Sequence, residues 1–88
     1  MKVFWTPNAW EEYLYWNHND QKILGWINDI IEDIQRDPFK GLGKPEPLKY
    51  HLQGYWSRRI TQEDRLVYRV TGKDDTQRLE IIQCRYHY

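Results

Sequence analysis

A single glutamate stands between two prolines in the segment Gly43–Lys49, and cationic side chains follow it at short intervals. Pro45 fixes its own φ, and Pro47 disfavours the helical conformation for Glu46, so this carboxylate is expected on a stiff, extended backbone. Most loop glutamates form solvated ion pairs, and the two prolines are the observation that raises a catalytic interpretation here. The cations that follow are Lys49, Arg58, Arg59 and Arg65. A positioned carboxylate can accept a proton while such cations hold a phosphate.

The C-terminal pair His87-Tyr88 supplies a group that can return a proton. An imidazole changes protonation near neutral pH, so it suits a general acid that protonates a leaving alkoxide. The alternation of Arg78–Tyr88 predicts one strand that continues to the C-terminus and holds His87 in place. Tyr88 can stack on a base or orient the leaving group. His51 is a further acid–base candidate of lower rank, because its segment has no regular pattern.

A base, several cations and an acid are the groups that cleave RNA through its own 2′-hydroxyl. The base removes the 2′-proton, the cations stabilise the pentavalent phosphate, and the acid protonates the departing 5′-oxygen. This reaction needs no metal and no cofactor, and the sequence contains no Asp/Glu cluster of the kind that holds two catalytic metals. Arg58 and Arg59 are adjacent in a predicted strand, so only one of them can share a sheet face with Arg65.

Length and composition predict one small domain over residues 1–88. Seven Tyr, five Trp and two Phe can fill the core and also offer rings for base stacking. The single cysteine excludes an internal disulfide. Neither a signal-peptide pattern nor an apolar run of membrane-spanning length is present. We therefore expect a cytoplasmic protein with no membrane partner.

Charge is distributed unevenly along the chain. Residues 1–37 contain three Lys or Arg and seven Asp or Glu, a net charge of −4, whereas residues 38–88 contain ten and six, a net charge of +4. A basic working face on an acidic support would bind a polyanion. Ordinary ion pairing between two layers explains the same numbers, and charge alone does not decide between the two interpretations.

The N-terminal half predicts one strand and two helices. Lys2–Trp5 has the residue types of a strand. Thr6 and Pro7 suit the first positions of a helix that is expected to end near Asn17. Asn19 or Asp20 can cap a second helix, which the Asp37-Pro38 pair ends. The inner stripe of that helix recurs at helical period: Ile23, Ile27, Ile30, Ile31 and Ile34.

The C-terminal half predicts a loop followed by strands. Glycines and prolines between Gly41 and Pro47 mark the loop. The expected strands are a short one over Leu48–Leu52, then Trp56–Thr61, Arg65–Thr71 and Arg78–Tyr88. The main elements follow the order β-α-α-β-β-β, which predicts an α+β domain with two N-terminal helices on a mainly antiparallel sheet.

Four segments, in this order, resemble the YoeB/Txe toxins of bacterial type II toxin–antitoxin systems, within the RelE superfamily. They are Gly43–Lys49, Trp56–Thr61, Arg65–Tyr68 and Cys84–Tyr88. The resemblance covers essentially the whole chain. It implies a RelE-like fold and a ribosome-dependent endoribonuclease that cleaves mRNA in the A site and thereby inhibits translation.

The resemblance also implies roles for individual residues. Glu46 resembles the general base, Arg65 the cation of the transition state, and His87 the general acid. Phosphate or RNA contacts are implied for Lys49 and Arg59.

Tyr88 resembles a residue that packs or orients beside the scissile phosphate. The implied partners are a cognate antitoxin with a flexible C-terminal segment, the small subunit of the 70S ribosome with its mRNA, and a second copy of the chain in a homodimer.

Two features depart from the family pattern. Asp64 precedes Arg65 where a histidine is common, and we expect this carboxylate to pair with Arg65 and weaken its hold on phosphate. The turn Gly72–Gln77 is also longer than is typical.

Two alternative functions compete with the nuclease. One is a domain of the same fold that binds RNA or protein without catalysis, and the other is a toxin that acts on a different target such as DNA topoisomerase. The joint presence of Glu46, Arg65 and His87 favours the nuclease.

Overall fold

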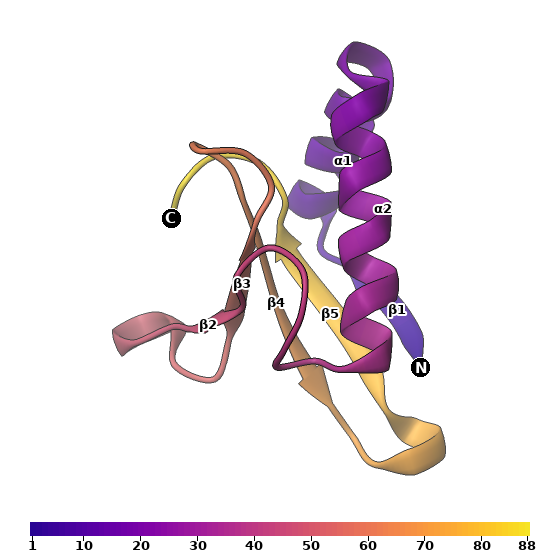
Figure 1. Ribbon diagram of the computed structural model, residues 1–88. Helices are drawn as coiled ribbons and strands as arrows, with labels where there is room; N and C mark the ends of the chain where they lie inside the picture. Colours follow the sequence, from indigo (N-terminus) through magenta and orange to yellow (C-terminus); the bar gives the residue numbers. More distant parts are fainter.

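The computed structural model describes residues 1–88 and places two helices on one face of a five-stranded sheet (Figure 1). The sheet has the strand order β1-β5-β4-β3-β2, in which β1 runs parallel to β5 and the other neighbours are antiparallel. The elements are β1 (Lys2–Trp5), α1 (Pro7–Asn19), α2 (Gln21–Arg36), β2 (Glu46–Pro47), β3 (Trp56–Arg59), β4 (Arg65–Thr71) and β5 (Arg78–Gln83). The predicted α+β architecture is confirmed.

Side-chain caps set the ends of both helices. The Thr6 hydroxyl accepts a hydrogen bond from the Ala9 amide at 3.2 Å at the start of α1. Asp20 ends α1 through its own amide and begins α2 by accepting a hydrogen bond from the Ile23 amide at 3.1 Å. These caps satisfy amides that have no partner within the helix. The predicted cap at Thr6 is confirmed, Asp20 and not Asn19 caps α2, and α1 runs two residues beyond its expected end at Asn17.

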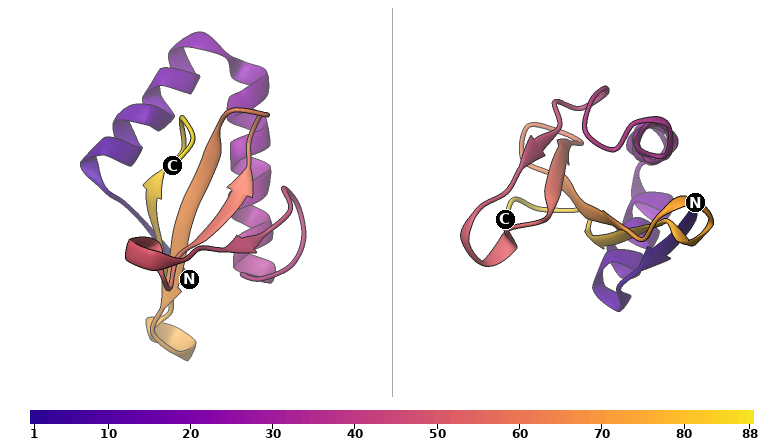
Figure 2. Two further views of the ribbon diagram at one scale, coloured as in Figure 1. Left: turned by 90° about the vertical axis from the view of Figure 1, so that its left-hand side faces the viewer. Right: turned by 90° about the horizontal axis from the view of Figure 1, so that it is seen from below.

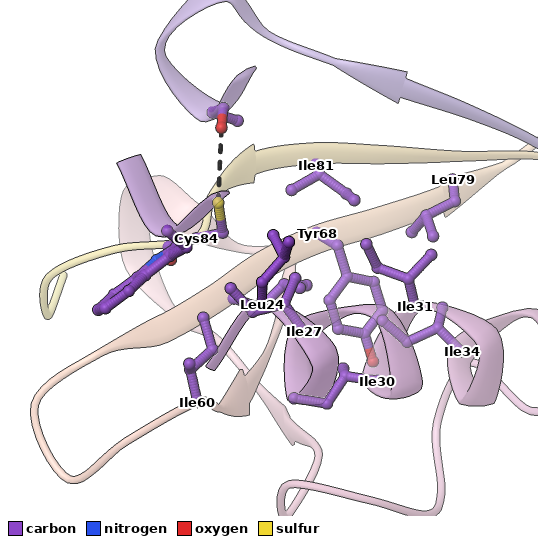
Figure 3. Close-up of a cluster of buried hydrophobic side chains, with 13 residues drawn as sticks. Leu24, Ile27, Ile30, Ile31, Ile34, Ile60, Tyr68, Leu79, Ile81 and Cys84 are labelled. Atoms are coloured by element: carbon purple, nitrogen blue, oxygen red, sulfur yellow. Dashed lines mark hydrogen bonds between the residues drawn. The ribbon is translucent and has the colours of Figure 1, made fainter. Parts of the chain in front are cut away.

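The core lies between α2 and the helix-facing side of β4 and β5 (Figure 3). Leu24 replaces Ile23 in the buried stripe of α2, and the other four predicted isoleucines are buried as expected. Fully burying one such side chain contributes roughly 1.5–3 kcal/mol. The sheet residues of this cluster include Leu66, Tyr68, Leu79 and Ile81.

Neither α1 nor α2 covers the opposite face of the sheet (Figure 1). In Figures 1 and 2 the segment around β2 and the C-terminus both lie on this side, away from α1 and α2. We call it the open face. Because paired residues point to the same side of a sheet, the register places Glu46, Ser57 and Val67 on this face together. Arg59 and Arg65, which pair directly, lie on it as well.

The predicted strand Leu48–Leu52 is wrong. The pairing strand is Glu46–Pro47, immediately before it, and Tyr50–Leu52 forms a turn of 3₁₀ helix. The backbone of Tyr50 has a φ of +59°, in the left-handed region, which is incompatible with a continuing strand.

The predicted strand to the C-terminus is also wrong, because β5 ends at Gln83. The register between β4 and β5 shifts between Val67 and Tyr68, so Ile82 is an additional residue on the β5 side. Strict alternation therefore fails at this point. Cys84 is buried in the core, and its thiol donates to the Ala9 carbonyl at 3.4 Å (Figure 3).

Candidate active site

Glu46 lies on the edge strand β2, exposed, directly opposite Ser57. It lines a pocket of about 430 Å³ together with Lys49 and Tyr88. The other lining residues belong to the same segment: Pro47, Leu48, Tyr50, His51 and Leu52. Three of the six residues predicted for the site are therefore gathered in one pocket, although they come from two distant parts of the chain.

Arg58 and Arg59 point to opposite faces of β3, as their adjacency requires. Arg59 is exposed on the open face opposite Arg65, whereas Arg58 is completely buried on the helix side. The structure thus decides which arginine shares a face with Arg65. Arg59 also lines a shallow hollow with Lys44 and Gln62, separate from the Glu46 pocket.

The buried Arg58 guanidinium has a structural partner for each of its nitrogens. It donates to Asp33 Oδ2 at 2.7 Å, to the Tyr68 hydroxyl at 3.1 Å, and to backbone carbonyls of the loop after α2. Hydrogen bonds from Arg58, the Leu42 amide and Arg36 lower the pKa of Asp33 to about 2. Arg58 therefore ties β3 to α2 and to the loop that leads to Glu46.

Arg65 is held against the turn between β3 and β4. Its Nη1 donates to the carbonyls of Thr61 at 2.9 Å, Gln62 at 3.1 Å and Asp64 at 3.0 Å. These three bonds use one nitrogen, so Nε and Nη2 keep their donors for a ligand.

The expected pairing of Asp64 with Arg65 is wrong. The Asp64 carboxylate instead accepts from the Thr61 hydroxyl at 2.6 Å and from the Tyr86 amide at 2.7 Å. The turn thereby satisfies the carboxylate locally and leaves the Arg65 charge uncompensated by it.

His87 is exposed and lies between two attachments of the C-terminal segment to the sheet. On one side the Tyr86 carbonyl accepts from the Arg65 amide at 3.0 Å. On the other side the Tyr88 hydroxyl lies 3.3 Å from Ser57 Oγ. The rings of His87 and Tyr88 stack with centroids 4.9 Å apart. His87 is thus held by its neighbours and by these two contacts, and not by strand pairing.

Two residues beside the site, Ser57 and Tyr50, and one that binds the C-terminal segment, Glu12, were not singled out from the sequence. Ser57 contacts Tyr88 across the sheet, and Tyr50 presents a ring that is 87% exposed at the rim of the Glu46 pocket. Glu12 accepts a hydrogen bond from the Cys84 amide at 2.9 Å. A serine in a strand and an acid on a helix carry no local signal, because their partners are distant in sequence. Tyr50 follows the Pro-Glu-Pro loop closely in the sequence, but only the structure shows that its ring is exposed.

Neither helix combines the length and hydrophobicity needed to cross a bilayer. No group of three or more His, Cys, Asp or Glu side chains comes together in a metal-binding arrangement.

Comparison with known proteins identifies the family. The protein-family model described as the YoeB-like toxin of bacterial type II toxin–antitoxin systems matches residues 5–88. Toxin YoeB from Escherichia coli O6:H1 is 57% identical over 88 residues, which cover the whole of both chains. A YoeB/ParE toxin structure from Agrobacterium tumefaciens superimposes with a TM-score of 0.98 at 56% identity and covers all of both chains.

A heterotetrameric YoeB–YefM toxin–antitoxin complex from Staphylococcus aureus contains a chain that is 44% identical, with a TM-score of 0.87, over 100% of this chain and 98% of that one. The superposition on the Agrobacterium tumefaciens toxin over the full length of both chains confirms the RelE-like fold expected from the sequence. The chain belongs to the family of YoeB-like toxins of bacterial type II toxin–antitoxin systems.

Proposed function

We propose that this protein is a ribosome-dependent mRNA endoribonuclease that cleaves message in the A site and so inhibits translation. The observation that carries the proposal is the arrangement of the open face. Glu46, Lys49 and Tyr88 line one pocket, His87 stacks on Tyr88, and Arg65 attaches through its amide to the residue before His87. A base, a cation and an acid on one accessible surface suit attack by the 2′-hydroxyl on the adjacent phosphate.

Each residue has a role that follows from its chemistry. The Glu46 carboxylate takes the 2′-proton as the oxygen attacks phosphorus. The Arg65 guanidinium stabilises the pentavalent phosphate, and His87 gives a proton to the 5′-oxygen as the P–O bond breaks. These three groups supply each proton transfer and the charge compensation, so the proposed reaction is metal-independent.

The remaining three residues bind and orient the RNA. Lys49 is exposed beside Glu46, and Arg59 is exposed beside Arg65, so both can hold phosphates on either side of the scissile bond. Tyr88 is 44% exposed, which leaves its ring accessible to a base.

The proposed partners are a cognate antitoxin and the 70S ribosome with mRNA on its small subunit, in the bacterial cytoplasm. The antitoxin is supported by the Staphylococcus aureus complex of a related chain. The ribosome follows from the proposed activity, because cleavage in the A site requires the message to be presented there.

A toeprint on translating bacterial ribosomes with a defined message tests the proposal. Wild-type protein should produce a new cut in the A site. Glu46→Gln and His87→Ala should each lower the cleavage rate by roughly 10²–10⁴-fold, the usual contribution of a general base or acid. Both residues are exposed, so the variants should remain folded.

Matched controls are available on other surfaces. Glu63→Gln changes an exposed acid outside the pocket, and His18→Ala removes an exposed histidine of α1, so both should cleave at the wild-type rate. Ribosome binding without any cut by the wild-type protein would overturn the nuclease and support a non-catalytic binder. If the wild-type protein neither cut the message nor bound the ribosome, the ribosome would be ruled out as the target.

A further inference from the structure

The C-terminal segment Cys84–Tyr88 is attached to the domain by two carboxylates that come from different elements, α1 and the turn between β3 and β4. Glu12 of α1 accepts from the Cys84 amide through Oε1 at 2.9 Å. Asp64, in the turn between β3 and β4, accepts from the Tyr86 amide through Oδ1 at 2.7 Å. Hydrogen bonds between an amide and a carboxylate are charge-assisted and stronger than bonds between neutral groups.

These carboxylates replace the strand pairing that the segment has lost. Since β5 ends at Gln83, the amides beyond it have no neighbouring strand to bind. The Trp16 indole donates to the Cys84 carbonyl at 2.8 Å, on the same side as Glu12. The Arg65 amide donates to the Tyr86 carbonyl at 3.0 Å, on the same side as Asp64. On each side, therefore, a carboxylate accepts from one amide of the segment and a second group donates to one of its carbonyls.

The Asp64 side chain is also held by contacts within its own turn. Its second oxygen accepts from the Thr61 hydroxyl at 2.6 Å, and Thr61 Oγ1 in turn accepts from the amides of Glu63 and Asp64. The same turn holds the Arg65 guanidinium through three carbonyls. A rigid turn therefore sets the positions of Arg65 and Tyr86 together, and Tyr86 precedes His87 directly.

We propose that Asp64 and Glu12 are positioning residues, which hold the backbone of Cys84–Tyr86 and so determine where His87 and Tyr88 lie on the open face. This inference rests on the proposed nuclease for the role of His87. The attachment itself is a property of the folded chain and can be tested without any reaction.

Amide hydrogen exchange of the whole protein tests the attachment. Asp64→Ala should speed exchange of the Tyr86 amide by about 10- to 100-fold, the loss expected for one charged hydrogen bond, while core amides such as Leu79 keep their protection. Asp64→Asn keeps one oxygen acceptor for the Tyr86 amide but loses the charge and the second oxygen, which accepts from Thr61, so its Tyr86 amide should exchange faster than in wild type and more slowly than in Asp64→Ala. Glu63→Ala, which removes an acid from the same turn, should leave the exchange rate of the Tyr86 amide unchanged. Unchanged Tyr86 exchange in Asp64→Ala would overturn the proposal.

The same design applies to α1. Glu12→Ala should speed exchange of the Cys84 amide by about 10- to 100-fold, Glu12→Gln should largely restore its protection, and Glu11→Ala, an exposed neighbour on the same helix, is the control. Equal protection of Cys84 in Glu12→Ala and wild type would remove Glu12 from the proposal.

Cleavage on programmed ribosomes tests the consequence for His87. Asp64→Ala should lower kcat about 10- to 100-fold with little change in KM, because Lys49 and Arg59, which are proposed to bind phosphate, lie outside the turn that Asp64 holds. Asp64→Asn, which keeps an acceptor for the Tyr86 amide, should recover part of kcat. If Asp64→Asn and Asp64→Ala lowered kcat equally, loss of the negative charge beside Arg65 would be the cause. The positioning role proposed for Asp64 would then be wrong. If wild-type protein did not cleave at all, the proposed function would fail, while the exchange results would still decide the attachment.

Discussion

Two adjacent arginines of one strand have opposite roles, and burial decides which is which. Arg58 has no exposed surface, and its charge is compensated by Asp33 at 2.7 Å. Arg59 faces solvent on the open face, opposite Arg65. A fully buried guanidinium that lost its partners would be very costly, whereas an exposed one is free to meet an anionic ligand.

Alanine at each position should separate stability from activity. Arg58→Ala should lower the free energy of unfolding by about 3–5 kcal/mol, because it removes the buried partner of Asp33 and leaves several backbone carbonyls without a donor. Arg59→Ala should change stability by less than about 0.5 kcal/mol and lower kcat/KM by roughly tenfold or more through the lost phosphate contact. Urea unfolding and ribosomal cleavage measure the two effects. A folded, inactive Arg58→Ala would contradict this assignment.

At the scale of elements, the junction between α1 and α2 depends on one residue. Asp20 closes α1 through its amide, which donates to the Trp16 carbonyl at 2.8 Å, and opens α2 through its side chain. Trp16 in turn binds the C-terminal segment through its indole. The helix ends therefore help to place the segment that carries His87, although the helices lie on the opposite side of the sheet.

Asp20→Ala should lower the free energy of unfolding by about 0.5–2 kcal/mol, the usual loss when an N-cap is removed. Asp29→Ala is the matched control, since it removes an exposed acid from the middle of the same helix and should have little effect. Thermal unfolding followed by circular dichroism compares the two variants. Equal losses would mean that charge, and not capping, is responsible.

At the scale of the whole molecule, part of the charge asymmetry is internal pairing. Asp33 from the acidic half binds Arg58 from the basic half, and Glu12 binds the backbone of the C-terminal segment. Arg59, Arg65 and Lys49 have no carboxylate partner and remain for a polyanion. Both interpretations of the uneven charge therefore hold, for different residues. Arg58 is used in ion pairing between the layers, whereas Arg59, Arg65 and Lys49 form a basic face.

Acid should weaken the fold through Asp33. Its pKa falls from an ordinary 3.8 to about 2 in the folded state, so the unfolded chain binds the proton more readily. The corresponding stability is present above about pH 4 and is lost as pH falls towards 2. The free energy of unfolding of wild type minus that of Asp33→Asn, measured by urea unfolding at several pH values, should shrink across this window.

Burial raises the pKa of Glu12, so its own contribution has the opposite sign, and the subtraction removes it from the comparison. A difference between wild type and Asp33→Asn that stayed constant between pH 4 and 2 would contradict the role assigned to Asp33.

The sequence by itself determined the features that depend on neighbouring residues. The cap at Thr6, a cap at Asn19 or Asp20, four of the five stripe isoleucines of α2 and the strand β4 follow from local spacing and side-chain chemistry. The extended backbone at Glu46 followed from its two prolines.

Only the tertiary structure decided the features that depend on distant partners. The burial of Arg58 requires Asp33, which lies 25 residues earlier, and the end of β5 is held by Glu12, 72 residues before Cys84. The role of Asp64 likewise depends on Tyr86, 22 residues later. Such contacts leave no local pattern, because each residue has an ordinary alternative as a solvated surface charge until the fold brings its partner into place.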